Sequence, residues 1–434
     1  MRLSRGTLLL IPCILAALPS SAATPTFSKD VAPILFKNCS GCHRTGEIGP
    51  MPLLNYAQAR PWAKSIRTAV ATGTMPPWHA KVERGVFSND RRLTAQDRDT
   101  LIAWADGGAP QGDPKDLPPT PAFAEGWEIG KPDVVVTMAK PYTVPATGTI
   151  EYQYIQIPTN FTGDKWVQAL EVRPGARAVV HHVLVFASEP SGGPRVKKPF
   201  TMVIPEITPE LRKKLAESEQ KRDDKPKRDP GPLLATYAPG TNAQVFDAGS
   251  AIRVKAGAVL TLQLHYTANG KETEDASSVG FIFAKQAPVN EVKSDAFMNP
   301  LLKLPAGAQD TAVDAGILFS EDVHVTGIFP HTHVRGKSWE YQLIYPDGRK
   351  EVVLAVPRYD FNWQTYYNFA TPLAIPKGSR LVSTAHYDNS PNNPANPDPK
   401  ADVKWGDQTW QEMQYTGITY MVDGKGTVQT AAGR

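Results

Sequence analysis

Cysteine is scarce in this sequence: only three occur in 434 residues, at positions 13, 39 and 42. So few cysteines exclude a fold held together by several disulfides. No charge of one sign dominates either, because 47 basic and 43 acidic residues leave a net charge of +4. No long basic run is interleaved with aromatic residues, so the chain lacks the usual signature of a nucleic-acid-binding protein.

Long apolar runs are missing as well. The most apolar stretch extends from Leu8 to Leu18, which is shorter than the roughly 20 residues that a membrane-spanning helix requires. Two arginines precede this stretch and small residues follow it, so residues 1–23 are predicted to be a secretory signal peptide. We therefore expect an exported protein without a membrane span, carried across the inner membrane to the periplasm.

The composition is that of a folded, multidomain chain. With 41% hydrophobic and 21% charged residues, the chain can bury a sizeable core and is not expected to be disordered. Helical patterns precede a proline-rich segment at residues 114–128, which reads as a semi-rigid linker. After it, from about residue 129 onward, strand patterns dominate.

Two of the three cysteines fall in the sequence CSGCH, which ends at His43. C-x-x-C-H is the attachment signature of a c-type haem. Cys39 and Cys42 can form thioethers to the two vinyl groups of the haem, and His43 can reach the iron from one side. A redox-active C-x-x-C motif is the alternative, but the adjacent histidine and the predicted export signal favour one covalent haem.

A second axial ligand for the haem iron is expected downstream. GTMPPWHA offers Met75 in a stiff loop, and a thioether at this position raises the reduction potential. Met51 and His79 remain alternatives, since a lone methionine more often packs in a core. With a capped helix predicted near residues 94–107, residues 24–113 resemble a class I cytochrome c, which implies an all-α domain.

The remainder of the chain is predicted to be all-β. In KSWEYQLIYPDGRKEVVLAV, apolar residues from Trp339 to Tyr345 alternate with polar ones and PDG turns the chain, which indicates a β-hairpin. Many such strands predict two antiparallel β-sandwiches, over residues 129–288 and 289–434. The dense mixed charge between Thr208 and Lys227 is typical of a solvated helix or mobile loop.

Five of the nine histidines lie in three strand-like segments, AVVHHVLVF, VLTLQLHYT and FPHTHVRG. His331 and His333 project from the same face of a strand and can bind one ion. His265 lies on the strand face opposite a row of leucines. His181 and His182 are neighbours that point to opposite faces of a regular strand, so joint binding requires a strand end or a bulge. Together, these histidines favour a metal site.

Copper is the metal that the surrounding residues favour. Imidazole suits zinc, copper, iron and nickel, whereas a thioether selects copper. Met413, in WQEMQYTG, is the candidate thioether. His324 and His386 are interpreted as structural. Residues 386–407 form a proline- and asparagine-rich loop that could border the site.

Four motifs, in order, resemble the copper type II, ascorbate-dependent monooxygenases, the family of the peptidylglycine-hydroxylating enzymes and dopamine β-monooxygenase. They are HHVLVF, LQLHY, HTHVRGKSW and the EM dipeptide of WQEMQYTG, and the resemblance covers residues 129–434. It implies two β domains that hold two copper ions across a solvent-filled cleft. The implied ligands are His181, His182 and His265 for an electron-transfer copper and His331, His333 and Met413 for the catalytic, O2-binding copper.

The resemblance implies an oxidoreductase that hydroxylates an activated C–H bond, with one atom of O2 entering the substrate. Its expected partners are a small-molecule substrate, O2 and an electron donor such as an ascorbate-like reductant or a redox protein. Peptide-amidating relatives hold a substrate carboxylate with an arginine and a tyrosine, whose positions are Phe329 and Gly417 here. A peptidylglycine substrate is therefore not expected.

The whole chain resembles bacterial proteins in which a cytochrome c precedes such a module. Two hypotheses follow. In the first, the haem passes electrons to the copper held by the three-histidine set of a monooxygenase. In the second, the chain is a non-catalytic electron-transfer protein whose β module binds copper or a partner protein.

Overall fold

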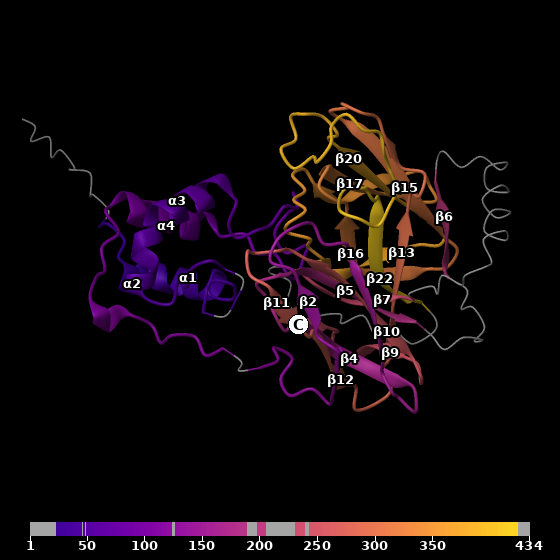
Figure 1. Ribbon diagram of the computed structural model, residues 1–434, viewed down its shortest axis with the longest axis horizontal. Helices are drawn as coiled ribbons and strands as arrows, with labels where there is room; N and C mark the ends of the chain where they lie inside the picture. Colours follow the sequence, from indigo (N-terminus) through magenta and orange to yellow (C-terminus); the bar gives the residue numbers. More distant parts are fainter. Residues whose placement is uncertain are drawn as a thin grey trace, which may run out of the picture.

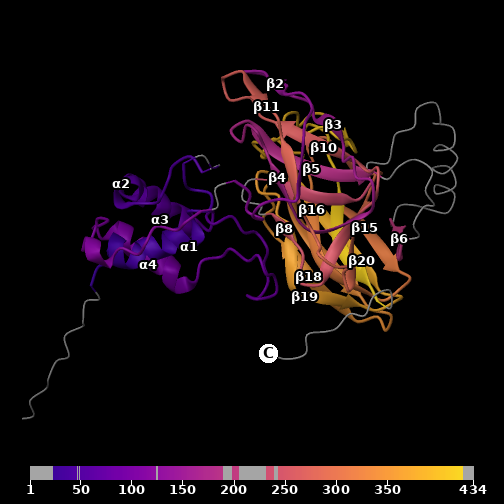
Figure 2. The ribbon, with the colours of Figure 1, turned by 90° about the horizontal axis from the view of Figure 1, so that it is seen from below.

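The computed structural model describes residues 23–45, 47, 49–123, 126–188, 198–204, 231–238 and 243–423. Apart from Ala23, the predicted signal peptide lies outside these ranges, as does the charged segment from Thr208 to Lys227. No helix within the described ranges is long and apolar enough to cross a bilayer. Helices lie on one side of the molecule and a larger body of strands on the other (Figure 1), and the view from below shows the same separation (Figure 2).

The helical segment consists of short helices around one small core. Its elements are η1 (Phe27–Val31), α1 (Ala32–Asn38), α2 (Tyr56–Ala59), η2 (Arg60–Trp62), α3 (Ala63–Thr72), α4 (Ala95–Asp106) and η3 (Pro114–Asp116). The hydroxyl of Thr94 accepts the N–H of Asp97 at the start of α4, as the sequence predicted. Gly73, with φ +70°, ends α3. Phe27 and Trp104 pack together at the centre of this core.

The predicted fold class, an all-α cytochrome c domain followed by two antiparallel β-sandwich copper domains, is wrong. The described chain is mostly strand, and its helices are few and short. Residues 78–89, which the sequence placed inside the helical domain, pack against the strands instead. We call these residues the arm. Trp78 and Phe87 of the arm are buried in the core of the β body, so the N-terminal part is not a separate all-α unit.

One large, nine-stranded sheet runs through both halves of the β body. Its strands are β1 (Val134–Thr137), β4 (Lys165–Arg173), β8 (Gln244–Val245), β9 (Ser250–Val254), β12 (Ser278–Phe283), β13 (Asn290–Met298), β16 (Val323–His331), β19 (Tyr367–Ile375) and β22 (Tyr415–Val422). The order is β1-β12-β4-β9-β13-β22-β16-β19, and β8 pairs with β4. β13 runs parallel to β9, so the two halves share a continuous sheet and the pairing is not entirely antiparallel.

Two smaller sheets cover this large sheet. The first contains β3 (Gln153–Pro158), β5 (Val180–Ser188), β7 (Leu233–Tyr237) and β10 (Val259–Tyr266), in the order β3-β10-β5-β7. The second contains β6 (Phe200–Val203), β15 (Thr311–Phe319), β17 (Gly336–Ile344), β18 (Lys350–Val356) and β20 (Arg380–Tyr387), in the order β18-β17-β20-β15-β6. Short pairs join β2 (Tyr142–Val144) to β11 (Thr273–Asp275) and β14 (Lys303–Leu304) to β21 (Val403–Lys404).

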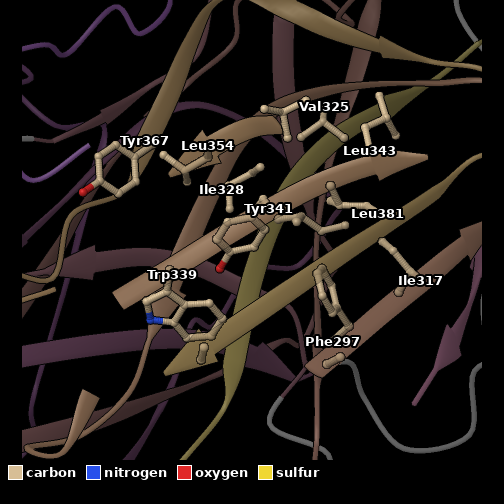
Figure 3. Close-up of a cluster of buried hydrophobic side chains, with 14 of the residues drawn as sticks. Phe297, Ile317, Val325, Ile328, Trp339, Tyr341, Leu343, Leu354, Tyr367 and Leu381 are labelled. Atoms are coloured by element: carbon tan, nitrogen blue, oxygen red, sulfur yellow. The ribbon is translucent and has the colours of Figure 1, made fainter. Parts of the chain in front are cut away.

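Each smaller sheet encloses a hydrophobic core against the large one. The core behind β17 and β20 contains Trp339 and Tyr341, whose rings stack 5.5 Å apart (Figure 3). Burying each such side chain contributes about 1.5–3 kcal/mol. The predicted hairpin is confirmed, since Trp339 of β17 pairs with Val356 of β18. The alternation of apolar and polar residues in β17 places its apolar residues in this core.

Candidate metal centre

Three predicted ligands meet where β5 lies beside β10. His182 pairs directly with His265, but the next residue of β10, Tyr266, pairs with Val180. The pairing therefore skips His181, which makes it the extra residue of a β-bulge. The bulge turns His181 to the same side of the strand as His182. The structure therefore confirms the bulge that the sequence required if both histidines are to bind one ion.

The three imidazoles form a compact donor set. One ligand atom from each of His181, His182 and His265 lies within 4.8 Å of the other two. The Nε2 atoms of His181 and His182 and the Nδ1 atom of His265 are buried without a hydrogen-bond partner. A buried polar atom without a partner costs about 1–3 kcal/mol, and a metal ion would satisfy all three. Zinc or copper would fit this set, because imidazole suits both.

Burial keeps these histidines neutral. Desolvation, assisted by the neighbouring imidazoles, holds the pKa of His182 well below its usual range. The same cause lowers the pKa of His265 to about 3. A metal binds the neutral imidazole, so the ligand form is the one that the buried site already favours.

A second pair of histidines lies at the end of β16. The rings of His331 and His333 are 5.2 Å apart, and both side chains are buried. His331 Nδ1 lies 2.9 Å from Gln364 Oε1, and His333 Nδ1 lies 3.2 Å from the carbonyl oxygen of Gln411. An Nδ1–H that donates to such an acceptor orients the ring and leaves Nε2 for a metal. The Nε2 atom of His333 is indeed buried without a hydrogen-bond partner.

The backbone around His333 is held by a buried carboxylate that the sequence did not single out. Glu412 accepts hydrogen bonds from the backbone N–H groups of His333 at 2.8 Å, Arg335 at 2.7 Å and Met413 at 3.2 Å. Desolvation raises the pKa of Glu412 to about 7, although the hydrogen bonds and Arg335 oppose the shift. The only sequence signal for this residue was its place before the candidate thioether.

The asparagine-rich loop supports the same turn from another side. Asn389 accepts a hydrogen bond from Arg335 Nε at 2.9 Å, and Asn393 donates to the carbonyl oxygen of Val334 at 3.2 Å. Both asparagines belong to the predicted loop 386–407, which therefore borders the histidine pair through this turn.

The backbone of Met413 is linked to the backbone of His333. Glu412 ties the N–H of Met413 to that of His333, and the carbonyl oxygen of Met413 accepts a hydrogen bond from Tyr387 at 2.7 Å. The side chain is half-buried. A ligand role for its sulfur stays a prediction.

The two histidine sets are neighbours. The ring centroids of His182 and His331 are 6.4 Å apart. Tyr152 borders both sets, at 5.4 Å from His182 and 6.1 Å from His333. Phe361 stacks on His181 at 5.2 Å and lies 6.2 Å from His333. Sequence reasoning missed these two aromatic residues and Gln364, because no short-range pattern connects them to the histidines.

The other two histidines of the β body lie elsewhere. His324 Nδ1 lies 2.7 Å from a carboxylate oxygen of Asp423, and His386 Nδ1 lies 2.8 Å from one of Asp310. Their interpretation as structural residues agrees with these pairings.

The haem-attachment motif follows α1. Cys39 and Cys42 are unpaired thiols, and desolvation followed by the charge of Cys42 raises the pKa of Cys39 to about 12. His43 Nδ1 lies 3.2 Å from the carbonyl oxygen of Met51, which leaves Nε2 for an iron atom. A Cβ at Gly49 would lie 2.7 Å from the carbonyl oxygen of Cys42, so only glycine fits there. The donor set is compatible with a covalent haem.

The candidates for the sixth haem ligand are dispersed. Met75 follows α3, and its N–H donates to the carbonyl oxygen of Ala69 at 3.2 Å. His79 belongs to the arm, where burial lowers its pKa and Asp360 of the β body opposes the shift. The carbonyl oxygen of Met51 lies 3.2 Å from His43 Nδ1. The choice among the three candidates stays a prediction.

A cavity of about 600 Å³ lies between the motif and the β body. Cys42 and Glu47 line it from the helical side, and Arg173, Arg177 and Tyr237 line it from the strands. Glu47 and Arg177 form an ion pair across it. Because Arg177 lies only four residues before His181, the motif and the three-histidine set are connected through a short stretch of chain.

No protein-family model matches the chain, and no curated protein matches it. Some solved viral capsid proteins show a weak likeness. The major capsid protein P2 from bacteriophage PM2 is 13% identical, with a TM-score of 0.27 over 68% of this chain and 99% of that chain. A structure of infectious bursal disease virus, Gt strain, is 11% identical, with a TM-score of 0.19 over 70% of this chain and 74% of that chain. TM-scores this low support no assignment of fold or function.

Proposed function

We propose that the chain is a copper-dependent monooxygenase of the periplasm, an oxidoreductase that hydroxylates an activated C–H bond of a small molecule with O2. The observation that carries the proposal is the group of three imidazoles at the β5 bulge, with buried nitrogens that have no hydrogen-bond partner. His331 and His333 lie next to this group with their rings already oriented. Five neutral imidazoles, with the thioether of Met413 as the expected sixth ligand, suit copper better than a hard cation.

His181, His182 and His265 would hold one copper, and His331, His333 and Met413 would hold the other. Bound copper would supply O2 activation and the electrons that insertion of one oxygen atom requires. The chain itself orients the rings through Gln364 and the Gln411 carbonyl. It fixes the turn at His333 through Glu412 and packs Phe361 and Tyr152 against the histidines. These tasks are the protein's usual share of metal catalysis.

Cys39, Cys42 and His43 would hold a haem, which would supply electrons from a donor outside the chain. The Glu47–Arg177 ion pair supports this role, because it holds the motif against the segment that leads into β5. Met75 is our choice for the sixth ligand.

The substrate is expected to be a small molecule that is less anionic than a peptidylglycine. Phe329 stacks on His331, with centroids 6.1 Å apart, and on Tyr366 at 5.7 Å. Leu184 and Leu233 pack against the same phenyl ring. These contacts bury Phe329 completely, so no cationic side chain stands at the position where the peptide-amidating enzymes have an arginine for a carboxylate.

The first test counts metals and then measures turnover. The exported, haem-loaded protein is reconstituted with copper and dialysed, and iron and copper per chain are measured by mass spectrometry. One iron and two coppers are expected. Met413→Ile should then abolish substrate-dependent O2 consumption without changing the haem spectrum, because the thioether favours the reduced copper.

Met202→Ile is the matched control, since Met202 is exposed on β6 and its substitution should leave O2 consumption unchanged. Iron without tightly held copper would refute the monooxygenase. Two coppers with no turnover under any reductant would favour the electron-transfer protein instead.

A further inference from the structure

A fully buried carboxylate, Asp275, lies at the end of β11. A carboxylate in such a place is costly unless hydrogen bonds satisfy it. Its Oδ1 atom accepts the backbone N–H of Ala176 at 2.8 Å. Its Oδ2 atom accepts the hydroxyls of Tyr266 and Ser277, each at 2.8 Å. The carboxylate is therefore well satisfied, and it joins segments that are far apart in the sequence.

Two of these three donors lie beside the strands that carry the three-histidine set. Tyr266 directly follows His265 in β10. Ala176 belongs to the turn that leads into β5, the strand of His181. Through these hydrogen bonds, Asp275 connects the end of one ligand-bearing strand with the start of the other.

The β-bulge falls between these two connections. The pairing of β5 with β10 shifts between His265 and Tyr266, and His181 is the extra residue. A bulge disrupts the ladder of backbone hydrogen bonds locally, so contacts at its flanks have to fix the extra residue. Asp275 makes a contact on each flank, through Tyr266 on β10 and through Ala176 before β5.

The segment around Asp275 is closely packed. A Cβ at Gly175 would lie 2.8 Å from the backbone nitrogen of Ala276, so only glycine lets the turn before β5 approach this segment. Asp275 also pairs with Tyr142 of β2, and the ring of Tyr142 stacks on that of Tyr266 with centroids 4.9 Å apart. The short pair of β2 and β11 therefore holds both the carboxylate and the Tyr266 ring in place.

We infer that Asp275 is a positioning residue for the three-histidine set, which fixes the bulge of β5 and thereby turns His181 toward His182 and His265. The inference rests on the proposed function and deepens it, because it assigns a residue outside the ligand set to the geometry of that set. Replacing a residue that orients metal ligands lowers metal affinity about 10–100-fold. Asp275 acts through the strands, so we expect the lower end of that range.

Copper binding to the three-histidine set alone tests the inference. All variants are made in the full, haem-loaded chain with His333→Ala, which removes a ligand of the second copper. Each is titrated with Cu(II) against a competing chelator, and electron paramagnetic resonance records the copper spectrum. Asp275→Ala removes all three hydrogen bonds, and Tyr266→Phe removes one while keeping the ring. Both should raise the Cu(II) dissociation constant about tenfold and alter the copper hyperfine splitting.

Tyr142→Phe is the matched control. It removes a hydroxyl from the ring that stacks on Tyr266 and leaves the three hydrogen bonds of Asp275 in place, so affinity and spectrum should not change. If Asp275→Ala fails to fold, Tyr266→Phe decides. A purely structural role would lower the unfolding temperature of Tyr266→Phe without changing its copper affinity or spectrum.

That result would overturn the inference and leave the monooxygenase standing, whereas a His333→Ala parent that binds no copper would overturn both.

Discussion

Glu412 is a clear case of a single residue that fixes the geometry of the site from outside it. Its carboxylate is fully buried and accepts three backbone N–H groups, from His333, Arg335 and Met413. A buried carboxylate is costly unless it is well hydrogen-bonded. The turn around His333 meets that condition, and its shape therefore depends on this side chain.

Glu412→Gln should destabilise the protein and displace His333. The amide group directs an N–H toward backbone donors and leaves the nearby Arg335 without its negative partner. A loss of about 1–3 kcal/mol is expected for the unmade hydrogen bonds. Urea unfolding would measure the stability, and copper content after dialysis would report the displaced ligand.

Glu351→Gln is the matched control, because Glu351 is exposed on β18. It should change stability by no more than about 0.5 kcal/mol. If Glu412→Gln retained both copper ions and full stability, the positioning role of this carboxylate would be disproved.

At the scale of single residues, the sequence predicted the histidines and the methionine as candidate ligands. It did not predict the aromatic side chains that pack against them. HxH and HH are local patterns, and even the requirement for a bulge at His181 followed from strand geometry. Tyr152 and Phe361 reach the histidines only through tertiary packing. An aromatic residue in a loop resembles any other such residue until the chain has folded.

The arm is the element whose position was least predictable. In the fold, the N–H of Lys81 donates to the carbonyl oxygen of Ala355 at 2.8 Å, and Phe87 forms a bridge with Phe369 of β19. Asn89 donates to the carbonyl oxygen of Tyr366 at 2.6 Å. The loop between β18 and β19, which carries Phe361, is therefore held from outside by the arm.

Sequence patterns could not reveal this placement. The arm has neither the helical nor the strand period, and its apolar residues Trp78 and Phe87 gain partners that lie more than 250 positions later in the chain. Proximity to the haem motif made a haem-binding loop the natural interpretation. The wrong fold class followed from assigning these residues to the nearest helices.

Phe87→Ala should detach the arm and loosen the loop that it holds. Phe87 is 2% exposed and its ring contacts Trp78, Tyr367 and Phe369. Removal of such a ring costs about 3–5 kcal/mol. Denaturant unfolding would measure the loss, and amide hydrogen exchange should accelerate in residues 357–369.

Trp62→Ala serves as the comparison, since Trp62 is 42% exposed on the helical segment. It removes an even larger ring and should leave the exchange of residues 357–369 unchanged. Unaltered exchange in Phe87→Ala as well would show that the loop does not depend on the arm.

On the scale of the whole molecule, the C-x-x-C-H motif is joined to the β body across the cavity that Cys42 and Arg177 line. The Glu47–Arg177 ion pair crosses the cavity there, with side chains 17% and 24% exposed. Partly exposed ion pairs contribute up to about 1 kcal/mol. That amount shifts the ratio of docked to undocked molecules by roughly fivefold.

On the proposed function, Arg177→Gln should slow electron transfer from haem to copper. Stopped-flow oxidation of ferrous haem in the copper-loaded chain would measure the rate, and a larger slow fraction is expected. Arg253→Gln removes an arginine that pairs with Glu291 instead and should leave the rate unchanged. Equal rates in the two variants would exclude a docking role for Glu47 and Arg177.

The position of β6 restricts how the gene for this fold can be divided. This strand belongs to the chain between β5 and β7, yet it pairs with β15 in the other smaller sheet, with Phe200 opposite Phe319. A gene cut at the boundary between the two predicted sandwiches would separate β6 from β15, with which it pairs among the described residues, and leave β13 without β9. The two halves therefore cannot be exchanged separately, and recombination has to transmit them, with the histidine set that each contributes, as one unit.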